Sequence, residues 1–242
     1  MRCGGDGSMV GGNAAMLHFS TLDLIALVWF LAAWLGYSYV IEFTAHGKSG
    51  LNGLMHRYRL QWMERMLARE ARMMDGQVIA SLQNGTAFFA SSSLLALGGA
   101  ATLFRSTDDM LSIVASLPLG ATVTHVGWEM KVMGLMVIFI YTFFKFAWAY
   151  RLYNYVAILV GAAPPAAEKN SAEAQRFVRG ATEVITDAGR HFNRGQRALF
   201  FALGYLGWFV GPVPLIAMTA GILVVMWRRQ FASSSRQAVL DA

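Results

Sequence analysis

YTFFKFAWAYRLYNY, residues 141–155, lies within one of the most apolar parts of this chain, yet it contains Lys145 and Arg151. A charge at the centre of a lipid bilayer costs at least ~2.5 kcal/mol, and the cost falls toward the membrane surface. If the surrounding segment crosses a membrane, the two basic residues therefore indicate which part of it approaches that surface.

The whole chain has a composition typical of membrane proteins. Of its 242 residues, 56% are hydrophobic and 14% are charged, against about 25% charged in soluble domains. We therefore expect lipid to surround part of the surface. The net charge is +6, but the basic residues lie between apolar blocks rather than in one aromatic-interleaved stripe, so nucleic acid is not an expected partner. The single cysteine, Cys3, excludes an intrachain disulfide and a cysteine metal cluster.

We expect one domain with short flanking segments. Residues 1–15 are rich in glycine and lack periodicity, so they are predicted to be disordered, with Met16 as an alternative start. Residues 16–230 are predicted to form a single helical membrane domain, and residues 231–242 a flexible tail. A cleaved signal peptide is not expected, because the apolar run after Met16 is long and no small-residue cleavage site follows it.

Four segments are apolar over about 20 residues or more, the length that an α-helix needs to cross a membrane. They are residues 22–41, 78–104, 132–150 and 198–227. No alternation of polar and apolar residues competes with these runs, and helices satisfy their own backbone hydrogen bonds in lipid. We therefore predict an all-α fold, an integral membrane four-helix bundle.

The connections between these segments predict the orientation. Residues 44–76 contain six Lys or Arg and residues 151–197 contain seven, whereas residues 105–129 contain only Arg105. Basic connections stay in the cytoplasm. The first and third connections are therefore predicted to be cytoplasmic, and both termini to face outward.

The fourth segment is unusual, because Gly211-Pro212-Val213-Pro214 stands at its middle. Either it is one kinked crossing, since membrane helices tolerate proline, or it is a re-entrant hairpin that turns at the prolines. The kinked crossing is the preferred interpretation. It leaves the tail residues Arg228, Arg229 and Arg236 outside, against the charge rule, whereas the hairpin returns them to the cytoplasm.

Both cytoplasmic connections are predicted to contain an amphipathic helix. Residues 54–74 and 172–194 repeat apolar side chains at helical spacing, with charges on the other side, as in helices that lie in the headgroup layer. Ser171 is placed to cap the second helix. Residues 162–170, which contain two prolines, are predicted to end the third apolar segment.

Two interpretations of Lys145 follow from its place in the cytoplasmic half of the third segment. In the first, its long stem reaches the headgroups and, with the neighbouring aromatic residues, anchors the helix at the interface. In the second, it points into the bundle toward a carboxylate, with Glu42 and Asp75 as candidate partners, and marks a functional site.

The second segment contains many small and polar residues, including Gln83 and Asn84. Close helix packing with hydrogen bonds between helices explains such a composition. The alternative is a polar strip along the path of a solute or ion.

Glu183, Asp187 and His191 repeat at intervals of four residues, so they share one face of the second amphipathic helix. Carboxylate and imidazole groups bind divalent metals, but three ligands on successive turns are too spread to close a site alone. We predict no metal site and no cofactor. The chain contains no nucleophile elbow, phosphate-binding glycine loop, HExxH motif or thiol pair, so an enzyme is not expected.

Four distinctive stretches lie between Trp62 and Pro212. They are WMERMLAREARMMDGQVIASL, FFASSSLLALGG, YTFFKFAWAYRLYNYVAILVGAAP and HFNRGQRALFFALGYLGWFVGP. In these stretches, in the same order, the chain resembles a family of bacterial and plant membrane proteins, the domain of unknown function 599 family. The resemblance implies a multi-pass membrane protein and no established activity, cofactor or catalytic residue.

The polar residues of these stretches are expected to gather in one cluster at the cytoplasmic side. The predicted cluster contains Arg72, Asp75, Gln77, Gln83, Lys145, Arg151, Asn154, His191, Asn193 and Arg194.

The leading hypothesis is a multi-pass protein of the bacterial inner membrane that moves or senses a small solute or ion through this cluster. The alternative is a non-catalytic interaction or assembly protein, whose basic helices bind anionic lipid headgroups, a second copy of the chain or another membrane protein. A third hypothesis is an enzyme that acts on a lipid headgroup with His191 and Asp187.

Overall fold

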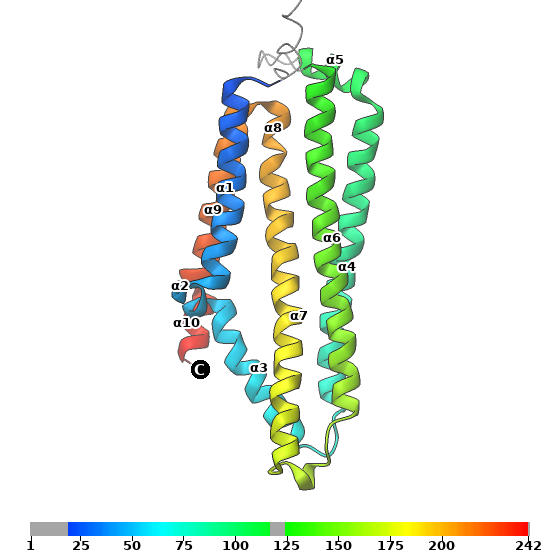
Figure 1. Cartoon of the computed structure of the whole chain (residues 1–242), viewed down its shortest axis with the longest axis vertical. Helices are drawn as coiled ribbons and strands as arrows, with labels where there is room; N and C mark the ends of the chain where they lie inside the picture. Colours follow the sequence, from blue (N-terminus) through cyan, green and yellow to red (C-terminus); the bar gives the residue numbers. More distant parts are fainter. Residues whose placement is uncertain (1–18, 117–123, 242) are drawn as a thin grey trace, which may run out of the picture.

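The computed structural model describes residues 19–116 and 124–241, which form helices and no strand (Figure 1). The predicted disordered segment 1–15 and Met16 lie outside the described residues. The elements are α1 (Thr21–Phe43), α2 (Ala45–Ser49), α3 (Leu51–Leu67), α4 (Met73–Arg105), α5 (Thr107–Ser116), α6 (His125–Gly161), the short 3-10 helix η2 (Ala166–Glu168), α7 (Ala172–Tyr205), α8 (Gly207–Val210), α9 (Pro212–Phe231) and α10 (Ser234–Asp241).

The long helices fall into two length classes. α1 and α9, with 23 and 20 residues, are about 34 and 30 Å long at a rise of about 1.5 Å per residue, which matches the hydrocarbon thickness of a bilayer. α4, α6 and α7 have 33, 37 and 34 residues and are about 50 to 56 Å long. These three helices therefore continue roughly 20 Å beyond the ends of α1 and α9 (Figure 1).

Among the described residues, four helical segments are long and apolar enough to cross a membrane. They are Thr21–Phe43, Met73–Arg105, His125–Gly161 and Pro212–Asp241. The first three predicted segments are confirmed, and the fourth is displaced toward the C-terminus.

Basic residues are concentrated toward one end of the molecule. We call this the basic end, and it holds α2, α3, α10 and the connection between α6 and α7, while α5 and α8 lie at the opposite end (Figure 1). Among the Lys and Arg residues from Arg57 to Arg236, only Arg105 and Lys131 belong to the opposite end. The ends of the long helices thus differ strongly in charge.

The predicted fourth crossing is in fact a turn between two antiparallel helices. α7 ends at Tyr205 near the opposite end, and the short α8 leads to Gly211, where the chain leaves the helical conformation. Pro212 then begins α9, a position that suits proline because its missing N–H has no partner in the first turn. The preference for one kinked crossing is therefore wrong.

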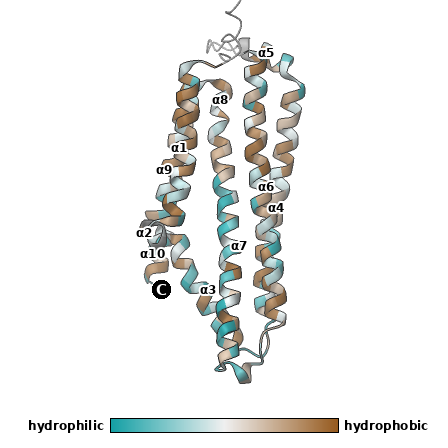
Figure 2. Ribbon diagram, viewed as in Figure 1, coloured by the Kyte–Doolittle hydropathy of each residue, from teal (hydrophilic) through white to brown (hydrophobic). Residues whose placement is uncertain are grey.

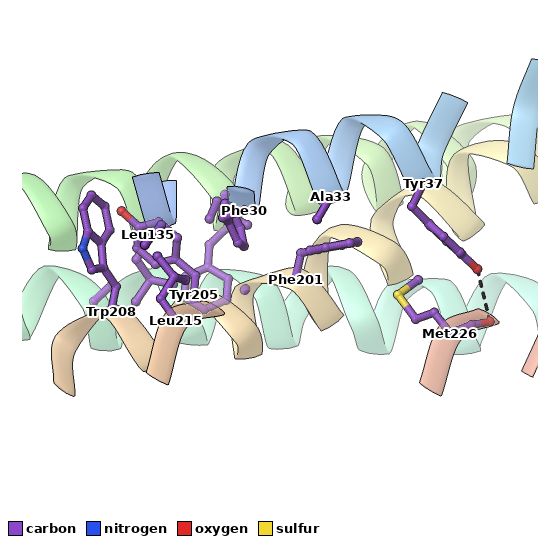
Figure 3. Packing of buried hydrophobic residues seen from close by; sticks show 14 of the residues in the cluster. Phe30, Ala33, Tyr37, Leu135, Phe201, Tyr205, Trp208, Leu215 and Met226 are labelled. Atoms are coloured by element: carbon purple, nitrogen blue, oxygen red, sulfur yellow. Dashed lines mark hydrogen bonds between the residues drawn. The ribbon is translucent and has the colours of Figure 1, made fainter. Parts of the chain in front are cut away.

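α9 returns to the basic end alongside α1. The Tyr37 hydroxyl of α1 donates a hydrogen bond to the Met226 carbonyl of α9 over 3.2 Å (Figure 3). Beyond α9, residues predicted to be a flexible tail form α10, where the Val239 carbonyl accepts a hydrogen bond from the Tyr58 hydroxyl over 3.1 Å. The arginines of the tail therefore lie with the basic connections, and the two ends of the described chain lie at different ends of the molecule.

The two segments predicted to be amphipathic helices are helical, but within different bounds. α3 ends at Leu67, earlier than the predicted 54–74, and residues 172–194 are the first part of α7, which continues to Tyr205. Figure 2 shows α7 changing from hydrophilic to hydrophobic as it runs from the basic end to the opposite end. The predicted break before α7 is confirmed, as is its cap, because the Ala174 N–H donates to Ser171 Oγ over 3.0 Å.

Two apolar cores hold these helices together. The first joins α1, α6, α7, α8 and α9 and includes Phe30, Leu135, Phe201, Tyr205 and Leu215 (Figure 3). The second lies toward the basic end, joins α3, α4, α6 and α7, and includes Met63, Met66, Ile79, Val156 and Ile185. Because α6 and α7 run through both cores, they connect the half with the short helices to the half that extends beyond them.

Gly207 permits the tight turn between α7 and α9. A Cβ atom at this position would lie 2.8 Å from the backbone oxygen of Pro214 and 2.9 Å from Met218 Sδ. We predict that Gly207→Ala lowers the thermal unfolding temperature of the detergent-solubilised protein. Gly221→Ala is the matched control, because no atom lies within 4 Å of a Cβ there and alanine favours a helix. Equal unfolding temperatures for the two variants would contradict the tight turn.

Candidate functional site

The candidate site begins with a carboxylate at the last turn of α1. Glu42 accepts hydrogen bonds from Arg194 Nε over 2.9 and 3.0 Å, and also from Arg194 Nη2. Its Oε1 accepts another from Arg197 Nη2. One carboxylate therefore joins two guanidinium groups on successive turns of α7 to the end of α1, and such charge-assisted bonds are the strongest class of protein hydrogen bond.

A cavity of about 590 Å³ opens beside this ion pair, between the end of α1, α2, α3 and α7. Its lining residues are Ile41, Glu42, Phe43, Gly47, Asn52, Gly53, His56, Arg59, Glu183, Thr186, Arg190, Asn193, Arg194 and Arg197. Four arginines face two glutamates there, so the lining has a positive excess. Its volume lies in the range of small-molecule sites.

The α3 wall of the cavity is held against α7 by polar contacts. His56 Nδ1 lies 3.1 Å from Thr186 Oγ1. One turn further along α7, Gly189 leaves room for Arg59, since a Cβ there would lie 2.6 Å from Arg59 Nη2. Arg59 thus lies against the α7 backbone, and burial holds the pKa of its guanidinium below the ordinary value, with the charge of Arg190 adding to the effect.

A second cavity, of about 20 Å³, adjoins the first and shares Ile41, Asn52, Asn193 and Arg197 with it. Arg197 is 6% exposed, and its buried Nε has no hydrogen-bond partner in the part of the chain that the structure describes. The buried Nε2 of Gln230, which lines the smaller cavity, also lacks one there. Unpaired buried donors cost free energy.

The predicted polar cluster is divided rather than gathered in one place. Of its ten residues, Asn193 and Arg194 line the large cavity. Lys145 lies nearby, partly buried, with its Nζ 5.0 Å from the centre of the Tyr141 ring. His191 packs against Trp148, and burial holds the pKa of its imidazole below the ordinary value, as do the charges of Lys145 and Arg194.

Three further predicted residues lie at the far tip of the basic end. Asp75 is buried and accepts hydrogen bonds from Trp62 Nε1 over 2.7 Å and from Arg69 Nη1 over 2.9 Å. Arg72 donates to the Ala163 carbonyl over 2.8 Å and to the carbonyl of the next residue, which ties the start of α4 to the connection between α6 and α7. Gln77 is exposed.

The remaining predicted residues join or flank α4 and α6. Gln83 Nε2 donates to Asn154 Oδ1 over 2.6 Å, and Arg151 Nε donates to the Tyr155 hydroxyl over 2.7 Å on an exposed surface. None of the residues of α4 lines either cavity. The hydroxyls of Thr86 and Ser93 donate to carbonyls of their own helix, so these contacts favour close packing over a polar path along α4.

Neither proposed partner of Lys145 forms an ion pair with it. Glu42 pairs with two arginines of α7, and Asp75 pairs with Arg69. Lys145 remains close enough to Glu42 to feel its charge, and it lies at the height where α1 ends, which is compatible with the interfacial interpretation.

Glu183, Asp187 and His191 do not converge. Asp187 pairs with Arg190 over 2.7 Å on the surface, Glu183 lines the cavity, and His191 contacts Trp148. Within residues 19–116 and 124–241, no three His, Cys, Asp or Glu side chains come together as a metal site.

Sequence analysis missed most of the cavity and one further ion pair. Arg59, Arg190 and Arg197 contribute to the basic connections in the sequence, and no spacing there indicates that they face one cavity. At the opposite end, buried Lys131 donates to the Trp208 carbonyl over 2.9 Å and lies 3.9 Å from Asp23.

These features define an all-α protein with four helices that are long and apolar enough to cross a membrane and with a polar cavity at its basic end. The family model "Protein of unknown function, DUF599" matches residues 25–235, so the chain belongs to that family, as the resemblance predicted. No curated protein and no solved structure matches the chain.

We predict that Glu42→Ala lowers the free energy of unfolding by about 3 kcal/mol, because it leaves the buried Arg197 and the partly buried Arg194 without their shared carboxylate. Chemical denaturation followed by circular dichroism would measure the change. Asp187→Ala is the control, since its pair with Arg190 is exposed and is expected to contribute at most about 1 kcal/mol. A loss no larger for Glu42→Ala than for the control would show that the Glu42 contacts do not hold α1 to α7.

Proposed function

We propose that the protein is a multi-pass protein of the bacterial inner membrane whose basic end faces the cytoplasm. The distribution of Lys and Arg supports this orientation, because positive residues are retained on the cytoplasmic side. The return of α9 removes the conflict that the tail arginines posed, since α10 now lies with α3. α4, α6 and α7 then project past the bilayer into the cytoplasm.

We propose further that the protein binds a small solute or ion in the cavity and either moves it or responds to it. The observation that carries this proposal is the cavity of about 590 Å³. Its lining includes Glu42 and Phe43, the last residues of α1, so it would open at the level of the headgroups. Such a position is reached from the cytoplasm by solutes and from the side by lipids.

The orientation is testable with single cysteines in a Cys3→Ser background. Asn193→Cys lines the cavity, whereas Asp108, with its side chain 92% exposed, lies at the opposite end. A membrane-impermeant thiol reagent should label Asn193→Cys in inside-out vesicles and Asp108→Cys in right-side-out vesicles. Labelling of Asn193→Cys from the periplasmic side alone would invert the proposed orientation.

Ligand binding is testable by filling the cavity. In a thermal-stability screen against inorganic ions, amino acids and sugars, at least one solute should raise the unfolding temperature, as binding to the folded state requires. Asn193→Trp should remove that shift because its indole occupies the cavity. If no solute stabilises the protein, or if the tryptophan variant responds equally, the cavity is not a binding site.

A second candidate function, assembly with another copy of the chain, is favoured by apolar residues on the projecting part of α4 and α6. Met73, Met74 and Ile158 are 82%, 71% and 67% exposed, in a region that would lie in water. Light scattering of the detergent-solubilised protein should show an oligomer that Ile158→Glu dissociates. The control is Val224→Glu on α9, which would face lipid, and an unchanged mass for both variants would exclude this contact.

A further inference from the structure

The proposed cavity-binding function leaves the class of ligand open, and the lining supplies evidence on that point. Arg59, Arg190, Arg194 and Arg197 stand against Glu42 and Glu183. The formal excess is two positive charges when each group carries its ordinary charge. A neutral or cationic solute would gain nothing from this excess, whereas an anion would.

The four guanidinium groups are not equally engaged. Arg194 and Arg197 share Glu42, and Arg190 pairs with Asp187. Arg59 forms no ion pair with any described residue, although it is partly buried against Gly189. A positive group removed from water without a counter-ion is costly, and a bound anion would supply the missing negative charge.

Two observations independent of the charge count concern residues that line the same cavity. The buried Nε of Arg197 is a donor without a partner in the described part of the chain. α3, a helix of 17 residues, begins at the cavity with Gly50 as an N-cap that makes no side-chain hydrogen bond, and no acidic residue stands in its first turn. Its Asn52 and Gly53 line the cavity, so the positive dipole end of α3 lies there, and the Gly53 N–H donates to the Gly50 carbonyl over 3.0 Å.

Guanidinium groups and helix N-termini share one preferred ligand chemistry. Arginine binds phosphate oxygens through paired, parallel hydrogen bonds, and uncapped helix N-termini bind phosphate through backbone N–H groups. A phosphate monoester carries a charge of about −1.5 to −2 at pH 7, opposite in sign to the excess of the lining. The volume of about 590 Å³ also leaves room for an organic group beside the phosphate.

From this geometry we infer that the cavity binds a phosphate group, held by Arg59, Arg194 and Arg197 with the N-terminus of α3. The inference rests on the proposed cavity-binding function and narrows its ligand to phosphate-bearing anions. The phosphate belongs either to a soluble phosphorylated compound or to the headgroup of an anionic phospholipid, since the cavity lies where α1 ends.

Calorimetric titration of the full-length protein in a neutral detergent tests the soluble source. Glycerol phosphate is the probe, and sodium chloride at equal ionic strength is the reference. Arg59→Gln should weaken binding about ten-fold, the effect of losing one charge-assisted hydrogen bond. The control is Arg57→Gln, because Arg57 is an exposed residue of the same helix outside the cavity lining, and it should bind as the unaltered protein does.

The lipid source is tested in nanodiscs of phosphatidylcholine and phosphatidylglycerol in equal parts. Native mass spectrometry after transfer to neutral detergent should find phosphatidylglycerol retained by the unaltered protein and by Arg57→Gln, and lost from Arg59→Gln. Retained lipid without glycerol phosphate binding assigns the headgroup, and the reverse assigns the soluble compound.

Glu183→Gln is a second variant that tests the inference even if Arg59→Gln fails to fold. Glu183 is an exposed residue at the cavity, and removing its negative charge should tighten phosphate binding several-fold. If neither probe binds the unaltered protein, or if neither Arg59→Gln nor Glu183→Gln changes the affinity for the probe, the inference fails. Should another solute still stabilise the protein in a manner that Asn193→Trp removes, the cavity-binding function would stand with a different ligand.

Discussion

The architecture depends on how charged side chains are paired at the level along the helices where α1 and α9 end. α1 and α9 end where a bilayer of ordinary thickness would end, whereas α7 passes that height with a hydrophilic first part and an apolar last part. Arg194 and Arg197 stand at the change, and Glu42 lies at the end of α1 opposite them. By accepting both guanidinium groups, Glu42 fixes how far α7 extends past α1, because a shift of one turn would leave one charge buried without a partner.

The same constraint explains why the first three apolar segments were predictable and the fourth was not. α1, α4 and α6 each contain an uninterrupted apolar run, and hydropathy detects such runs directly. The last turns of α7, the short α8 and most of α9 also form one run in the sequence, but the chain reverses direction within it at Gly211. Hydropathy carries no information about that reversal. The arginines of the tail did indicate the reversal, because a single crossing would leave them outside, against the charge rule.

The candidate site was predictable only in its general position. The predicted topology placed many polar residues toward one side of the membrane, and they do lie toward the basic end. However, α4, α6 and α7 extend about 20 Å beyond α1, so these residues are spread over that depth and do not share one surface. Asp75 lies at its tip, Gln83 and Asn154 between α4 and α6, and Arg194 where α1 ends. Depth along a helix that is longer than a bilayer is thick cannot be read from composition, because both parts have apolar faces.

Charged residues hold α1 at both of its ends in this fold. α1 is held near each end by an acid, with Asp23 close to Lys131 and Trp208 at the opposite end and Glu42 bonded to Arg194 and Arg197 at the basic end. At the opposite end a single lysine faces a single carboxylate, and neither cavity reaches it. At the basic end the arginines outnumber the carboxylates, and the surplus faces a cavity. Balanced charges stabilise the packing of α1, whereas the unbalanced charges at the basic end leave positive groups facing the cavity. The site therefore lies at the end of α1 where the charges do not cancel.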